Sequence, residues 1–153
     1  MDKAPRRCIG LDVYRDFAQV AIWQRGQVRQ AGTFATTPEG VREFAAGLGP
    51  ADEVALEATG NTWAIAAVLA SRAGRVVVSN PVKTRAIAEA NVKTDKVDAA
   101  ILAQLLAADY LPPVWLPDAE TAALRRQVLR RAQIVRQRTR LKTIHLAEVL
   151  NAR

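Results

Sequence analysis

The chain has 153 residues, half of them hydrophobic and 24% charged, which suits a globular domain with a core and excludes a disordered polymer. Its longest apolar runs, such as Val76–Val78, are too short to span a bilayer, and no long apolar stretch follows the basic start, so we expect neither a membrane-spanning helix nor a signal peptide. The net charge is +7, and residues 111–153 alone hold nine Lys or Arg against three Asp or Glu. This basic end favours nucleic acid as a partner, although a solvated Arg-rich helix face is the simpler alternative.

The apolar pattern predicts three strands at the start of the chain, followed by helices and strands in alternation. Thr37 and Pro38 predict the first helix start, because a capping hydroxyl precedes a proline at the first helical position. The predicted strands cover residues 9–13, 17–23, 28–34, 53–56 and 75–79, and the predicted helices cover residues 38–46, 62–70, 81–90, 95–106 and 118–150.

This order, βββαβαβα and then a helical tail, predicts an α/β fold with a mixed sheet and helices on its faces. It is the order of the RNase H-like (RuvC-like) fold. We therefore expect a catalytic domain over residues 1–110, a Pro-rich linker over 111–117, and a basic helical segment over 118–153.

Two acidic residues lie within or directly after predicted strands, where a charged side chain suggests a functional role. Asp12 lies inside the apolar run Ile9–Val13, and a buried charge there calls for a partner such as a metal ion, unless the side chain faces solvent. Glu57 follows the strand 53–56, at the strand end where ligands bind in open α/β sheets. A turn or helix-capping role is the alternative for Glu57.

Two further acidic residues, Asp95 and Asp98, are three positions apart at a predicted helix start. In a helix this spacing places both carboxylates on one face, near enough to share an ion. The alternative is a pair of first-turn acids that interact with the helix dipole. Lys93 and Lys96 flank the pair, and we expect them either to neutralise it or to contact a phosphate.

Four carboxylates from separate elements suit Mg²⁺ (or Mn²⁺), which prefers oxygen ligands and supports phosphoryl transfer.

The chain resembles the DEDD transposases of the IS110 group, which are related to Piv invertase. The resemblance lies in four runs taken in order: Ile9–Val13, Leu56–Gly60, Ser79–Pro81 and Lys93–Ala99. The first domain of that family resembles the Holliday-junction resolvase RuvC. The resemblance maps the catalytic, metal-binding quartet onto Asp12, Glu57, Asp95 and Asp98, and it matches Asn80 and Pro81 to a pair that shapes the neighbouring loop.

The resemblance also implies partners and parts beyond this sequence. It implies action on DNA, a structured guide RNA, and a coiled coil followed by a domain with a nucleophilic serine. Since the only serines, Ser71 and Ser79, match no such position, we expect the chain to be incomplete and inactive alone. We expect it in the prokaryotic cytoplasm, associated with the nucleoid.

The tail combines apolar residues at roughly helical spacing with many basic ones. It is expected either to pack on its own domain or to pair with a second protomer, in a homo-oligomer whose arginines face nucleic acid. The nucleic-acid-binding candidates in the tail are Arg125, Arg126, Arg130, Arg131, Arg136, Arg138, Arg140 and Lys142.

Three functions compete on this sequence. The first is the catalytic domain of a DNA transposase or recombinase. The second is an actin-like or sugar-kinase ATPase lobe, which requires a Gly- and Thr-rich phosphate loop after the first aspartate, whereas Val13–Phe17 contains no glycine. The third is a non-catalytic remnant that binds nucleic acid or dimerises. Divalent-metal binding separates the first from the third.

Overall fold

A computed structural model describes residues 6–60, 62–91, 98–115 and 117–151. The chain divides into two compact units, residues 1–115 and 116–153. The second unit contains one long helix, α5 (Ala119–Asn151), and the first contains all the other elements. These are β1 (Arg7–Val13), β2 (Phe17–Gln24), β3 (Gln27–Ala35), α1 (Pro38–Ala46), β4 (Asp52–Glu57), α2 (Thr62–Ala70), β5 (Arg75–Ser79), α3 (Pro81–Asn91) and α4 (Ala99–Ala107).

The five strands form one mixed sheet in the order β3-β2-β1-β4-β5. Strands β1, β2 and β3 form an antiparallel meander, whereas β4 runs parallel to both β1 and β5. The meander follows from short turns, and the parallel pairs follow from helical crossovers such as α2 between β4 and β5. This confirms the predicted α/β fold class, a mixed RNase H-like sheet followed by a terminal helix.

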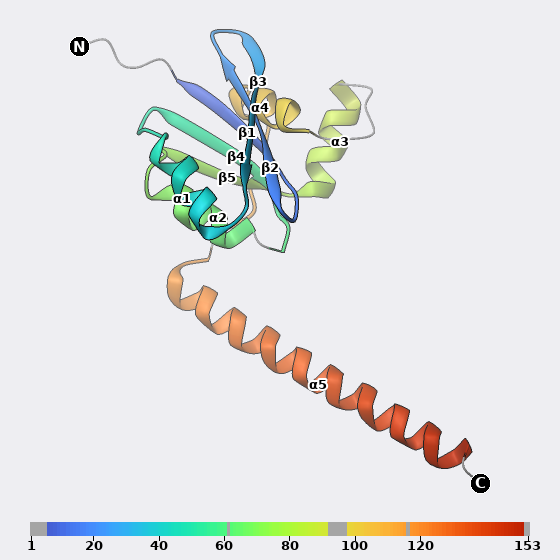
Figure 1. The fold of residues 1–153 in the computed structure, drawn as a ribbon. Coiled ribbons are helices and arrows are strands. Elements are labelled where there is room, and N and C mark those ends of the chain that lie inside the picture. Colours follow the sequence, from blue (N-terminus) through green and yellow to red (C-terminus); the bar gives the residue numbers. More distant parts are fainter. Residues whose placement is uncertain (1–5, 61, 92–97, 116, 152–153) are drawn as a thin grey trace. The chain divides into compact units, whose positions relative to one another are not determined.

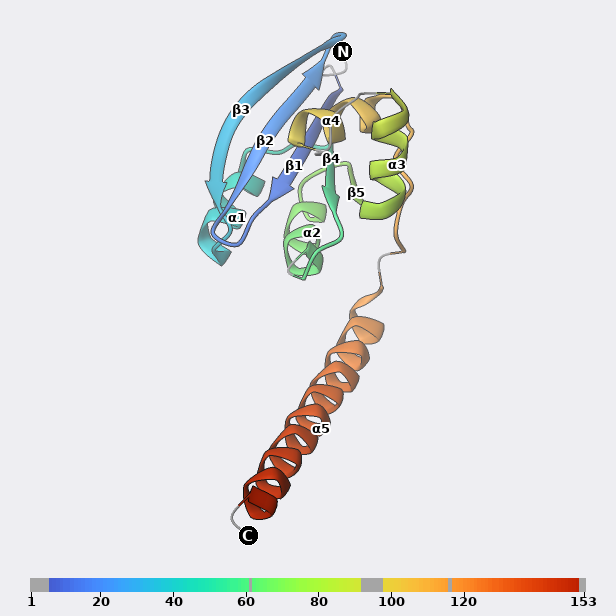
Figure 2. The same cartoon turned by 90° about the vertical axis from the view of Figure 1, so that its right-hand side faces the viewer.

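Helices cover both faces of the sheet (Figures 1 and 2), and each face has its own core. Alternate side chains of β1 and β4 point to opposite faces. Ile9, Leu11, Val54 and Leu56 pack with α1 and α2. Cys8 and Ala55 pack with α3 and α4 on the other face. By the same alternation, Gly10, Asp12 and Glu57 belong to the face of α3 and α4, which is therefore the face that bears the candidate site.

Helix α4 crosses β1 at Gly10, and a glycine is needed there. A Cβ atom at this position would lie 1.9 Å from the carbonyl oxygen of Ala99 and 2.6 Å from the backbone nitrogen of Ala103. Both distances are far below van der Waals contact, so any side chain would displace the helix. Gly10 thereby brings the first turn of α4 against the strand that carries Asp12.

The helix predicted to begin at Asp95 begins instead at Ala99, and this corrects the argument from helical spacing. Asp98 is the N-cap of α4: its backbone is extended, with φ −101° and ψ 177°, and its side chain accepts a hydrogen bond from the Ile101 amide. Aspartate favours this position because its short carboxylate satisfies an amide that has no partner within the helix. Asp98 therefore precedes the helical turns of α4, so an argument from helical spacing does not apply to its carboxylate. Asp95 itself lies outside the described residues.

Much of the Pro-rich segment predicted as a linker lies along the edge of β5. The Asn80 amide donates to the Pro112 carbonyl (3.1 Å), and the Val114 amide donates to the Val78 carbonyl (2.7 Å). An antiparallel bridge joins Ser79 to Pro113 between these two hydrogen bonds. The segment thus covers an edge strand that would otherwise present unpaired backbone groups.

The second unit starts at a capped helix terminus. Asp118 accepts a hydrogen bond from the Thr121 amide (2.8 Å), which stabilises the first turn of α5. Among the helices in the described part of the chain, none has the length and apolar character needed to cross a membrane.

Candidate functional site

Asp12 and Glu57 come together because β1 and β4 are parallel and in register. Leu11 pairs with Leu56, so the next residue on each strand, Asp12 and Glu57, extends the same row. Both side chains belong to the face covered by α3 and α4, at the carboxyl ends of their strands. Neighbouring parallel strands lie about 4.8 Å apart, so the two carboxylates share one small region of the sheet edge.

The environment of Glu57 shifts its ionisation equilibrium. Burial raises the pKa of Glu57 above its ordinary value, and the charge of Asp12 raises it further. Arg85, on α3, acts in the opposite direction and lowers the pKa of Glu57, but the net shift is upward. A raised carboxyl pKa means that the surroundings disfavour the ionised form. Burial and the neighbouring charge of Asp12 are therefore the two features of this sheet edge that oppose ionisation of Glu57.

Tyr14 is a site residue that the sequence analysis missed. Its hydroxyl donates a hydrogen bond to Oδ2 of Asp12 at 2.7 Å. Its ring stacks on that of Phe17, with centroids 4.8 Å apart and an interplanar angle of 21°. The available signal was spacing, because residues two apart along an extended chain point to the same side.

Asp98 lies at the start of α4, the helix that crosses β1 at Gly10, on the same face of the sheet as Asp12 and Glu57. It is partly buried and caps the helix. Within the described ranges, no three His, Cys, Asp or Glu side chains gather closely enough to hold a metal ion. Asp95, Lys93 and Lys96 lie outside those ranges, so the four-carboxylate site stays a prediction.

Asn80 and Pro81 organise the neighbouring loop. The side-chain oxygen of Asn80 accepts hydrogen bonds from the amides of Val82 (3.0 Å) and Lys83 (3.2 Å). Pro81 is the first residue of α3, where its fixed φ is favourable and its missing N–H costs nothing. This cap fixes the start of the helix that carries Arg85.

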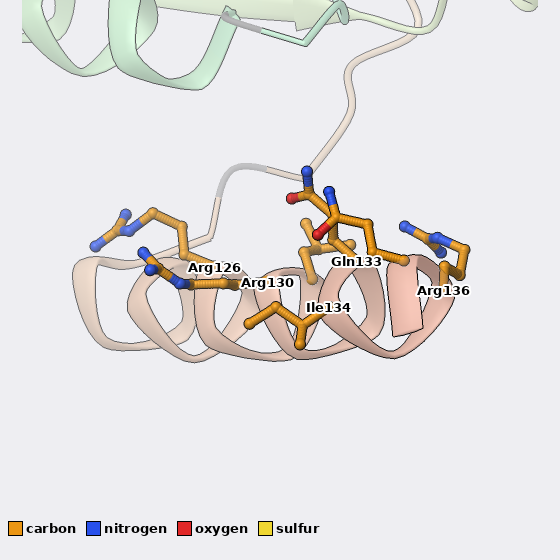
Figure 3. Close-up of a pocket in the computed structure, with 7 residues that line it drawn as sticks. Arg126, Arg130, Gln133, Ile134 and Arg136 are labelled. Carbon is orange, nitrogen blue, oxygen red and sulfur yellow. The ribbon is translucent and has the colours of Figure 1, made fainter. Parts of the chain in front are cut away.

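Helix α5 carries the basic candidates of the tail, and all eight of their side chains are exposed. Several large apolar side chains of α5 are exposed as well, among them Val128 at 65% and Leu141 at 67%. Figure 3 shows arginines and glutamines projecting from this helix around a shallow groove. The groove is lined by Arg126, Leu129, Arg130, Gln133, Ile134, Arg136 and Gln137. Because it is formed by the side chains of one helix, it lacks the concave, largely apolar walls of a typical small-molecule site.

Comparison with known proteins identifies the family. The model of the DEDD transposases of the IS110 type, described as a transposase, matches residues 9–152. The curated proteins contain no match to the chain. The match extends from β1 into the end of α5 and includes all four predicted acidic residues, so the chain belongs to the IS110 family of DEDD transposases.

Proposed function

We propose that Asp12, Glu57, Asp95 and Asp98 together bind Mg²⁺ or Mn²⁺, and that this domain acts on DNA phosphodiesters through that metal centre. Membership of a transposase family makes DNA the substrate class. Beyond family membership, we propose the metal, its four ligands and the place on the sheet where the reaction occurs.

The observation that carries the proposal is the adjacency of Asp12 and Glu57 at the carboxyl ends of two parallel strands. Burial and, to a smaller extent, the charge of Asp12 raise the pKa of Glu57, and a bound divalent cation would stabilise the ionised carboxylates. Carboxylate oxygens are also the donors that Mg²⁺ prefers, so the residues present fit this ion. Such an ion, when bound, supplies charge stabilisation and an activated nucleophile for phosphoryl transfer.

The protein's own groups prepare the site. The Tyr14 hydroxyl restrains the Asp12 carboxylate through their hydrogen bond. Asp98, at the start of α4, lies on the same face, and Arg85 adds positive charge that favours the ionised form of Glu57. Restraint of this kind matters because residues that orient metal ligands commonly change metal affinity or activity by about 10–100-fold when mutated.

Thermal unfolding with increasing Mg²⁺ or Mn²⁺ tests the metal site. Metal that binds only the folded state should raise the melting temperature of the wild-type chain. The increase should be much smaller in Asp12→Asn and absent in the Asp12→Asn, Asp95→Asn double variant. Asp16→Asn, in the exposed turn after β1, is the matched control and should respond like the wild type. An unchanged response in the double variant would place the metal elsewhere.

For the tail, we propose that α5 provides contacts to DNA and to a structured guide RNA and joins protomers into a homo-oligomer. Its exposed arginines support the first role, through phosphate contacts and counterion release. Its exposed apolar side chains support the second, because a helix gains stability by burying such residues against a partner. For a protein that acts on DNA in this way, we propose a location in the prokaryotic cytoplasm, in association with the nucleoid.

A non-catalytic nucleic-acid-binding or dimerisation remnant is the second candidate. It is favoured by one observation, that three metal-binding side chains do not gather within the described ranges. A remnant of this kind would bind nucleic acid without any thermal response to Mg²⁺ or Mn²⁺, so the same metal titration separates the two candidates.

A further inference from the structure

Among the described residues, part of the sheet face that bears Asp12 is exposed. Where α4 crosses the sheet, Gly10 and Ala21 are buried. Nearer the β1–β2 turn, Gln19 and Phe17 are exposed on the same face, Phe17 by 41%. In Figure 2 this turn lies at the lower end of the sheet, and α4 lies over its upper part. An open strip of sheet therefore adjoins the Asp12–Glu57 pair.

The strip contains a pre-ordered aromatic pair. The backbone N–H of Tyr14 donates to the Phe17 carbonyl at 2.9 Å, and the two rings stack. The Tyr14 hydroxyl is held in turn by Asp12. The ring of Phe17 is thus fixed in orientation while much of its surface contacts water. Fixed, exposed rings are what proteins use to stack on unpaired bases, and little conformational entropy is lost on binding.

We propose that Phe17, backed by Tyr14, stacks on an unpaired base of the DNA strand whose phosphate approaches Asp12 and Glu57. Arg15 is exposed in the same turn and supplies a cation for the backbone of that strand. One exposed ring beside polar Gln19 and charged Arg15 is too small an apolar area for a protein partner, whereas it matches the face of one base. The inference rests on the proposed action on DNA, and it adds a contact to the base.

The test uses the full chain and a DNA duplex with one unpaired 2-aminopurine, a fluorescent base that is quenched by stacking. The fully paired duplex is the reference, and both are titrated in Mg²⁺ and in EDTA. Wild type should quench the probe. Phe17→Ala should abolish the quench and weaken binding of the unpaired-base duplex roughly fivefold to a hundredfold, the usual effect of losing one stacked base. Affinity for the paired duplex should stay unchanged.

Three further variants define the contact. Phe17→Trp should keep both quench and affinity, and Phe17→Leu, which keeps apolar volume without an aromatic face, should lose the quench. Tyr110→Ala removes an aromatic ring that is 66% exposed elsewhere in the first unit, and it should behave as wild type. Equal melting temperatures without metal verify that the variants fold.

The outcomes separate this inference from the proposed metal site. Retention of quench and affinity in Phe17→Ala, or an equal loss on the paired duplex, overturns the stacking contact. If that result accompanies a Mg²⁺ response that is lost in Asp12→Asn, the metal site stands and only the inference fails. If the Mg²⁺ response is absent while Phe17→Ala still loses unpaired-base affinity, the inference stands and the metal site fails. Tighter binding of the matching RNA strand would contradict the assignment to DNA.

Discussion

At the scale of single residues, Gly10 decides how closely α4 approaches the strand that carries Asp12. Gly10→Ala would place a methyl group 1.9 Å from the Ala99 carbonyl oxygen. Because this contact is with backbone, relief requires a shift of the whole helix, and we expect a loss of about 1–3 kcal/mol in the free energy of unfolding. Urea denaturation measures this loss of stability. Gly60→Ala is the control, since a Cβ there meets nothing within 4 Å. Equal stability of the two variants would refute the packing argument.

Glu57 carries a second prediction at this scale, because its folded-state pKa is raised by burial and by Asp12. A carboxyl whose pKa is raised on folding contributes stability at low pH that is lost as pH rises through the folded-state value. In EDTA, Glu57→Gln should therefore melt higher than wild type at neutral pH, and the difference should shrink toward pH 4. Glu43→Gln, an exposed glutamate of α1, is the control. A Glu57→Gln variant that is less stable than wild type at neutral pH would contradict this assignment.

At the scale of elements, one buried carboxylate joins β1, β4 and the turn before β4. Asp52 is 3% exposed and accepts hydrogen bonds from Nε of Arg7 (2.6 Å) and from the Gly49 amide (2.7 Å). Burial by itself would raise the pKa of Asp52, but these hydrogen bonds outweigh it and the pKa is lowered. The ion pair therefore stabilises the fold above the unfolded-state pKa, and this contribution is lost as pH falls through the lower, folded-state value.

Asp52→Asn should accordingly lower the free energy of unfolding by about 1.5–3 kcal/mol at neutral pH, the usual value of hydrogen bonds to a charged group. The difference in free energy of unfolding between Asp52→Asn and the wild type should become smaller as the pH is lowered. Denaturant unfolding at several pH values measures both effects. The control is Asp16→Asn, in an exposed turn, whose free energy of unfolding should stay close to that of the wild type. If Asp52→Asn remained equally destabilised at low pH, the lost interaction would not depend on the charge of Asp52.

At the scale of the whole molecule, positive charge is concentrated toward the end of the chain. Residues 111–153 have a net charge of +6, against +1 for residues 1–110. Deleting residues 116–153 should strongly lower affinity for duplex DNA and structured RNA and flatten its salt dependence, because fewer phosphates are neutralised. The first unit should keep its fold, since its two cores and the segment along β5 lie within residues 1–115.

Binding titrations at several salt concentrations compare the deleted and full-length chains, and circular dichroism verifies the fold. If affinity and salt slope are unchanged, α5 does not bind nucleic acid and is a packing or dimerisation helix. The path of the nucleic acid would then lie over the open strip of the sheet alone.

Local chemistry made several elements predictable from the sequence alone. Thr37 and Pro38 indicate the start of α1, and the Thr37 side chain does accept a hydrogen bond from the Gly40 amide. The β-branched run of β5 was predicted at residues 75–79, the bounds that it has in the structure. Caps, prolines and apolar periodicity act within a few residues, so they can be read from one sequence. The family motifs around Asp12 and Glu57 were recognisable for the same reason.

Only the tertiary structure decided which of these residues meet. Asp12 and Glu57 are 45 positions apart, and their adjacency depends on the parallel register of β1 and β4, which local patterns do not specify. The capping role of Asp98 follows from where α4 starts against Gly10, a matter of packing between distant segments. The contact of Tyr14 with Asp12 required the orientations of both side chains. The sequence by itself determined the elements and the candidate acids, and packing across the sheet determined their neighbours, because contacts between distant segments depend on the whole chain.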